Sequence, residues 1–225
     1  METYLSESDH RRISEAVAEA ESRTSGEIVT VLARQSDGYT DVALSIAAFI
    51  ALLTVSLVAA FPDFFTGVAD YFLNNWAHEW TVQQVLVLAA VLTTAKFAVV
   101  WLLLLWQKLR FALIPGRVKT RRVHERAIGP FKVGAERRTK GRTGILIYLS
   151  MQEHRAEIVA DEAIASQVPA EVWGEAMADM LIEIKKGRIA DGIIAGIRDV
   201  GAILADHFPP DSADKNELPD RLIEL

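Results

Sequence analysis

Four charged residues that could hold an ion surround one predicted hairpin turn and the loop that follows it: Glu153, Arg155, Asp161 and Glu162. Carboxylates can bind a hard cation, and a nearby guanidinium can bind a phosphate group. The alternative is a solvated turn with ordinary charges, because Ca²⁺ takes six to eight oxygen ligands and only Asp161 and Glu162 are adjacent. The sequence therefore indicates a candidate anion or cation site with no defined cofactor, for which a divalent cation such as calcium is one candidate.

Other chemistry-bearing patterns are missing from the sequence. The chain has no cysteine, which excludes a thiolate nucleophile, a disulfide and a Cys-based zinc site. It contains no HExxH zinc motif, no phosphate-binding P-loop and no GxSxG nucleophile elbow. Three of the five histidines, His10, His124 and His154, do not stand at a metal-ligand spacing. The sequence predicts no catalytic residues and leaves open whether the protein is an enzyme.

Two apolar segments predict membrane-spanning helices at residues 42–61 and 85–106. The first has twenty residues without a charge, enough to cross a hydrocarbon core about 30 Å thick. The second carries a single charge, Lys96, near its middle. An ionisable residue inside a membrane is a functional candidate. Alternatively, Lys96 extends toward the headgroups or is held by hydroxyl and backbone oxygens, Thr54 of the first span lying at a similar depth in an antiparallel pair.

Lysine and arginine near the span ends predict the orientation. The loop at residues 62–84 contains no Lys or Arg, so we expect it outside and both chain ends in the cytoplasm, as for a protein of a bacterial inner (plasma) membrane. Its aromatic residues, Trp76 included, favour either a short interfacial helix or a simple turn with aromatic anchors. The basic flank after the second span is expected to face anionic lipid headgroups; it consists of Lys108, Arg110, Arg117, Lys119, Arg121 and Arg122.

The polar sequence on either side of the spans predicts one α/β domain in two pieces. The expected organisation is a first half at residues 1–40, a transmembrane hairpin at 41–107, a second half at 108–208 and a flexible acidic tail at 209–225. Residues 27–33 are apolar and β-branched, which predicts a buried strand whose neighbours must come from beyond the spans. Residues 145–150 and 155–160 predict a hairpin. Helices are expected at residues 8–24 and 117–131, from Pro169 onward, and at 189–204.

The stretch RTGILIYLSMQEHRAEIVADEAI, residues 142–164, resembles the central hairpin of TPM domains. The opening helix and strand, AIGPF at 127–131 and the helical residues 185–209 fit the same family, which is named in part for thylakoid-lumen and photosystem II repair proteins. The resemblance implies an α/β sandwich, with a small sheet flanked by helices and with the two-helix hairpin inserted after the first strand. Some members are described as phosphatases, others as assembly factors, and some bind calcium through acidic loops. Here the hairpin splits the domain, as in a bacterial-type membrane variant.

The expected function is that of an integral membrane protein whose cytosolic TPM-like domain acts in assembly or protein interaction. The alternatives are a membrane-anchored, phosphatase-like hydrolase and a subunit of a channel or transporter. We expect the partners to be the lipid bilayer and either another protein or further copies of the chain. Nucleic acid is not expected, since the net charge is −6.

Overall fold

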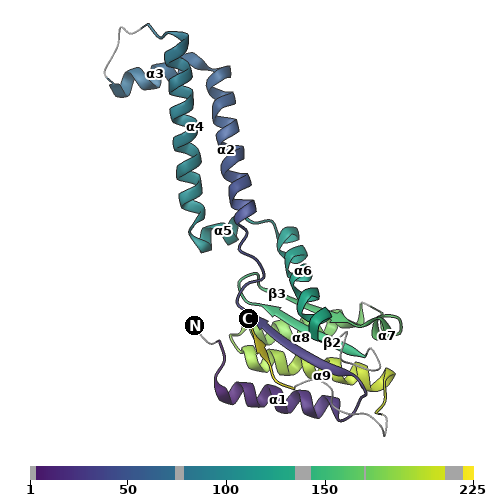
Figure 1. The fold of residues 1–225 in the computed structure, drawn as a ribbon. Helices are drawn as coiled ribbons and strands as arrows, with labels where there is room; N and C mark the ends of the chain where they lie inside the picture. Colours follow the sequence, from purple (N-terminus) through teal and green to yellow (C-terminus); the bar gives the residue numbers. More distant parts are fainter. Residues whose placement is uncertain (1–3, 74–78, 135–142, 170, 211–219) are drawn as a thin grey trace. The chain divides into compact units, whose positions relative to one another are not determined.

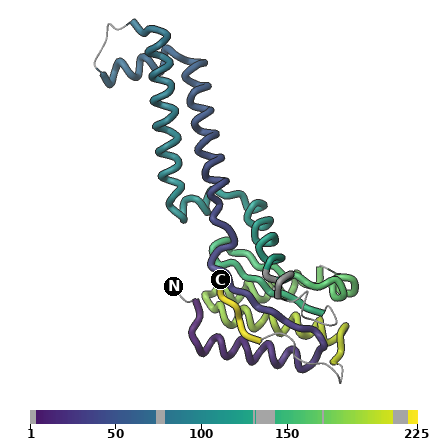
Figure 2. The backbone as a smooth tube through the Cα atoms, in the orientation of Figure 1, coloured from purple at the N-terminus to yellow at the C-terminus, as the bar shows by residue number. Residues whose placement is uncertain are grey.

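The structure is a computed structural model that describes residues 4–73, 79–134, 143–169, 171–210 and 220–225 (Figures 1 and 2). It divides into two compact units. Unit 1 combines Met1–Asp37 with Pro115–Leu225, and unit 2 is Gly38–Ile114. Unit 1 is thus built from two segments that are separated in the sequence by the whole of unit 2.

Unit 1 contains a four-stranded sheet with the order β3-β2-β1-β4. The strands are β1 (Glu27–Ala33), β2 (Gly144–Ser150), β3 (Arg155–Ala160) and β4 (Ile223–Glu224). β1 and β2 are parallel, with Glu27 opposite Gly144 and Ala33 opposite Ser150. β2 and β3 form the antiparallel hairpin that the sequence predicts. The prediction that residues 27–33 lie beside residues 145–150 is confirmed.

Two apolar layers sandwich this sheet, because alternate residues of β1 and β2 point to opposite faces. Ile28 and Leu32 of β1 join the larger core with α1 (Glu7–Glu21), α8 (Val172–Lys185) and α9 (Ile189–His207). Val31 and Ala33 join a smaller core with α6 (Gly116–Gly134). Figure 1 shows α6 over one face of the sheet and the other three helices over the opposite face. The expected α/β sandwich is confirmed.

One predicted helix start is used in the structure, and another is not. Ser6 caps α1 in a capping box with Asp9, so the predicted start signal is used. α8 begins at Val172, not at Pro169, whose carbonyl accepts the Val172 N–H in a turn. A four-residue helix, α7 (Glu162–Ala165), follows β3.

The expectation of a loosely held tail from residue 209 needs correction for residues 220–225. There the chain returns to the sheet, and Ile223 pairs with Val31 in parallel. Leu222 is buried in the larger core, and the Leu225 N–H donates to the Leu32 carbonyl. Burial of Leu222 and pairing with the edge of β1 hold this segment in place. Residues 211–219 lie outside the described part of the chain.

Unit 2 contains two long apolar helices, α2 (Thr40–Ala60) and α4 (Val82–Leu104). Both are long and apolar enough to cross a membrane. A shorter helix, α3 (Pro62–Leu73), occupies the predicted loop, and α5 (Gln107–Leu113) follows α4. The loop is therefore helical over its first half, while Trp76 lies outside the described residues.

Few side chains of α2 and α4 are buried, and three of these five are alanines. Ala43, Ala47 and Val58 are buried on α2, and Ala89 and Leu104 are buried on α4. Large apolar side chains elsewhere on both helices are exposed, Leu52 to 66% and Leu86 to 64%. Small residues inside a helix pair and large apolar residues outside it are typical of helices packed in a membrane.

Candidate functional site

The four residues of the candidate ion site occupy the two ends of β3. Glu153 and Arg155 lie at its start, and Asp161 and Glu162 directly follow its end. A six-residue strand extends roughly 20 Å. The structure therefore places two of the four residues at each end of the strand and does not bring all four together.

Glu153 is the centre of a buried polar cluster at one edge of the sheet. Its side chain is 2% exposed although it lies in the turn between β2 and β3. Glu153 Oε1 accepts the Ser36 N–H at 2.9 Å, and Oε2 accepts a short hydrogen bond from Ser150 Oγ. Ser36 Oγ lies 3.0 Å from Ser150 Oγ and 3.1 Å from the Tyr148 hydroxyl. We call Ser36, Tyr148, Ser150 and Glu153 the sheet-edge cluster.

The hydroxyls of this cluster form a chain with one direction. The Glu153 carboxylate only accepts, so Ser150 donates to it; Ser36 then donates to Ser150, and the Tyr148 O–H donates to Ser36. Burial raises the pKa of the Tyr148 phenol, while its hydrogen bond with Ser36 and the nearby Arg126 guanidinium act in the opposite direction. Tyr148 therefore stays a neutral donor at physiological pH.

The sheet-edge cluster lies where α/β proteins commonly place ligands. β1 and β2 are parallel, and Ser36 and Ser150 stand at or just beyond their carboxyl ends. Positive charge is supplied by α6, since Arg126 faces Tyr148 and the Arg122 guanidinium pairs with Asp37 at 3.2 Å. A half-buried serine hydroxyl near an arginine can contact a phosphate or carboxylate.

Arg155, Asp161 and Glu162 have other surroundings. Arg155 donates to the His154 carbonyl and lies beside Gly116 at the start of α6. Asp161 is 4% exposed, and its Oδ2 accepts the Gly144 N–H at 3.1 Å, which ties the end of β3 to the start of β2. Glu162 is exposed on α7. The Asp161 hydrogen bond is thus one that holds the β2–β3 hairpin together.

The described residues do not fit a calcium site. No group of three or more acidic or histidine side chains among them is arranged to hold a metal ion. Both oxygens of Glu153 accept hydrogen bonds from protein groups, and Asp161 accepts a backbone N–H. Neither end of β3 offers the six to eight oxygens that Ca²⁺ takes.

Lys96 and Thr54 make no hydrogen bond to each other. Thr54 Oγ1 donates to the Ile50 carbonyl of its own helix. Lys96 is exposed on α4, and within the described residues it has no hydrogen bond or ion pair. The structure thus places the lysine on a surface of the helix pair.

The six residues of the basic flank divide between two helices. Lys108 and Arg110 lie on α5, and the other four lie on α6. Arg121 pairs with Glu125 at 3.7 Å, and Arg122 pairs with Asp37. Arg117 is exposed in the first turn of α6.

The sequence analysis missed Ser36, Tyr148 and Ser150. A signal was present, since Ser36 follows a buried strand by three residues and Ser150 ends another. Parallel strands place their carboxyl ends at the same edge of a sheet. Ser36 and Ser150 could therefore have been grouped once β1 was known to pair with β2 in parallel.

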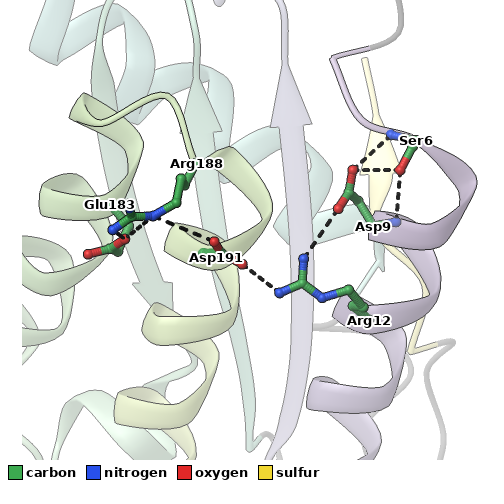
Figure 3. A network of polar contacts seen from close by, with 6 residues as sticks. All are labelled: Ser6, Asp9, Arg12, Glu183, Arg188 and Asp191. Atoms are coloured by element: carbon green, nitrogen blue, oxygen red, sulfur yellow. Dashed lines mark hydrogen bonds and ion pairs between the residues drawn. The ribbon is translucent and has the colours of Figure 1, made fainter.

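A second polar feature lies between α1 and α9. A network of ion pairs runs from Asp9 through Arg12 and Asp191 to Arg188 and Glu183 (Figure 3). The Arg12 and Asp191 side chains approach to 2.5 Å. Hydrogen bonds from Lys186 and Arg188 lower the pKa of the Glu183 carboxyl. Beside this network lies a cavity of about 520 Å³, which we call the α1–α9 groove; its sides include Glu15, Glu19 and Arg198.

Part of unit 1 is similar to a known protein family. The family model of the TPM domain matches residues 117–203, from α6 into α9. The NMR structure of the BA42 protein from the psychrophilic bacterium Bizionia argentinensis is similar in fold, with a TM-score of 0.57 and 18% sequence identity. That likeness covers 100% of this chain and 98% of the other. No curated protein matches.

Proposed function

Because the chain carries a TPM domain and two helices that could span a membrane, we propose that it is an integral membrane protein whose unit 1 acts in assembly or protein interaction. The observation that carries the proposal is the insertion of the apolar helix pair within the chain of unit 1. The chain passes between unit 1 and unit 2 twice, from Asp37 to Gly38 and from Ile114 to Pro115. A double covalent tether would keep its binding faces at the membrane.

The exposed surface of unit 2 supports the membrane part of the proposal. Within the most apolar 18 residues of each helix, only 22% are buried on α2 and 6% on α4. A helix in the core of a soluble protein would bury most of its apolar surface. On α3, Phe64, Tyr71 and Phe72 are at least 65% exposed, as expected for aromatic side chains at a membrane interface.

The charge pattern supports an orientation with both chain ends in the cytoplasm of a bacterial inner membrane. The segment between α2 and α4 has no Lys or Arg, and the basic flank follows α4. Alkaline carbonate washing of membranes should leave the full chain in the pellet. Reporter fusions at Asp70 should be active outside and fusions at Leu225 inside. Release by carbonate would contradict insertion, and an inside signal at Asp70 would contradict the orientation.

A phosphatase-like hydrolase is the second candidate, favoured by the sheet-edge cluster. In this proposal the Ser36 Oγ attacks the phosphorus of a phosphoester while its proton passes through Ser150 to Glu153. The bond from phosphorus to the ester oxygen breaks, and the alcohol leaves after taking that proton from the relay. Water then hydrolyses the phosphate ester on Ser36, which releases inorganic phosphate and restores the serine. Arg122 and Arg126 lie on the neighbouring helix and could balance the phosphate charge. Full-length protein should then hydrolyse p-nitrophenyl phosphate, with and without added Ca²⁺ alike. Ser36→Ala should abolish the activity and Ser166→Ala, an exposed serine on another loop, should not. No turnover by the folded wild type would contradict this candidate.

The channel or transporter alternative rests on Lys96 alone. Lys96 is exposed on α4, so it could line a polar path only if further copies of the chain surrounded it. A defined oligomer that disappears in Lys96→Leu would favour this alternative.

A further inference from the structure

α1 and α9 lie side by side and run in the same direction. Near their starts Arg12 pairs with Asp191, and near their ends Gly201 sits against Ala20, where an added Cβ would lie 2.7 Å from the Ala20 Cβ. The two pairs are eight residues apart on α1 and ten apart on α9, so at about 1.5 Å per residue the levels agree to within about 3 Å. Glu19 therefore lies within about 3 Å of the level of Arg198, across the α1–α9 groove.

Small side chains form part of the floor of the groove, and charged side chains form its rims. Ala16 and Ala195 lie low in the groove, the first buried and the second half-buried. Glu15 and Glu19 stand on the α1 rim, and Arg198 stands on the α9 rim. All three are exposed. The rims carry opposite charges, so a partner can approach closely if it places positive charge against the α1 rim and negative charge against the α9 rim.

The two ends of the groove differ in how their charges are satisfied. Near the starts of the helices, the network in Figure 3 pairs Arg12 and Arg188 with acids of unit 1. Further along, Glu15 and Arg198 make no hydrogen bond or ion pair with any described residue. Glu19 has only an exposed pair with Arg23 at 3.7 Å among the described residues. The groove therefore presents available negative charge on one rim and available positive charge on the other.

We propose that the α1–α9 groove is the contact face between two copies of this chain. With a two-fold axis along the groove, α1 of each copy faces α9 of the other at the same level. Arg198 of one copy then meets Glu19, and passes near Glu15, of the second copy, and the symmetry repeats the contact. The opposed rims make the surface complementary to itself, whereas a partner of one charge sign would meet repulsion from one rim.

The proposal rests on the membrane insertion and interaction role proposed above and names the partner. Ion pairs between exposed side chains typically contribute less than about 1 kcal/mol each, so this contact is expected to be weak in solution. Two copies held in one membrane would meet at a raised effective concentration, so that a weak contact suffices. The contact should also weaken with salt, because its charges are exposed.

Cysteine cross-linking of the full chain in membranes tests the proposal, since the protein has no cysteine of its own. Ala195→Cys places a thiol in the groove, and Ala18→Cys places one on an exposed position of α1 that does not line the groove. A bismaleimide that spans about one helix diameter, roughly 10–12 Å, should link two copies of the Ala195→Cys protein and not two copies of the Ala18→Cys protein. The yield should fall between low and high salt.

Charge reversal in the Ala195→Cys background separates the self-contact from other contacts. Arg198→Glu and Glu19→Arg should each lower the yield of linked dimer about tenfold, and the two together should restore it. Circular dichroism before cross-linking checks folding, and Arg198→Gln replaces any variant that does not fold.

The proposal is overturned if the wild-type charges give no more dimer than the Ala18→Cys control, if either single reversal leaves the yield unchanged, or if the double reversal fails to restore it. An adduct with a different protein as the main product overturns it as well. Carbonate extraction, measured separately, reports whether the membrane proposal itself has failed.

Discussion

The Ser36 backbone N–H donates a 2.9 Å hydrogen bond to Glu153 Oε1, across 117 positions of sequence. Ser36 lies just before the apolar helix pair, and Glu153 lies in the β2–β3 turn beyond it. The bond is one of several that close unit 1 around the insertion, together with the β1–β2 pairing. We therefore expect unit 1 to need both of its segments in order to fold, and its stability to respond to changes at this contact.

Glu153→Ala should lower the free energy of unfolding of unit 1 by about 1–3 kcal/mol, because it leaves the Ser36 N–H and the Ser150 hydroxyl without their buried acceptor. Glu153→Gln should cost less, since the amide oxygen can still accept the Ser36 N–H. Hydrogen exchange of β1 amides in the full-length protein measures the effect. Glu175→Ala, at an exposed position of α8, is the control and should change it by less than about 0.5 kcal/mol. Equal exchange in the Glu153→Ala protein and the control would argue against a stabilising role for this contact.

Glycines of α9 should not tolerate a methyl group. An added Cβ at Gly192 would lie 2.7 Å from the Met180 carbonyl oxygen, and one at Gly201 would lie 2.7 Å from the Ala20 Cβ. Gly192→Ala and Gly201→Ala should each destabilise unit 1 by about 1–3 kcal/mol through overpacking. Thermal unfolding measures this. Gly174→Ala on α8 is the matched control, with no atom within 4 Å of its added Cβ, and should be neutral or stabilising.

Asp199 should make unit 1 less stable as the pH rises. Burial, and secondarily the nearby Asp179 carboxylate, raises the pKa of Asp199 above its ordinary value of 3.8. The folded protein then binds a proton more tightly than the unfolded chain, so the stabilisation is full below pH 3.8 and is lost as the pH rises through the folded-state pKa. Asp199→Asn should therefore raise the melting temperature at neutral pH and flatten its dependence on pH in the acidic range. Asp206→Asn, at an exposed position of the same helix, is the control and should leave the melting temperature at neutral pH unchanged.

Lys96→Leu should insert into membranes at least as well as the wild type. A lysine near the middle of a span costs about 2.5–3.5 kcal/mol on insertion scales, and Lys96 makes no hydrogen bond or ion pair with the described residues that its loss would break. An insertion assay of the second span measures this, with Thr94→Leu, two residues away on the same helix, as the control. Poorer insertion of Lys96→Leu than of Thr94→Leu would show that the lysine is held by a partner in the membrane.

Much of the fold was predictable because it depends on local patterns. Two long uncharged or nearly uncharged segments predict the helices α2 and α4, since helices of soluble domains rarely run to such lengths without a polar face. The apolar strand at residues 27–33 required neighbours from beyond those helices, and the structure supplies β2. The capping signal at Ser6 likewise acts within one turn of helix.

The arrangement of the polar residues was decided only by the tertiary structure. Sequence proximity grouped Glu153 with Asp161, yet an extended strand carries them to opposite ends of β3. Pairing of distant segments brought Ser36 to Glu153, and the parallel packing of α1 and α9 set Glu19 close to the level of Arg198. A two-residue strand such as β4 has too few residues for a periodic signal and exists because the edge of β1 accepts it. Periodicity along the chain determines which residues face a core, but only the packing of distant segments determines which polar groups meet.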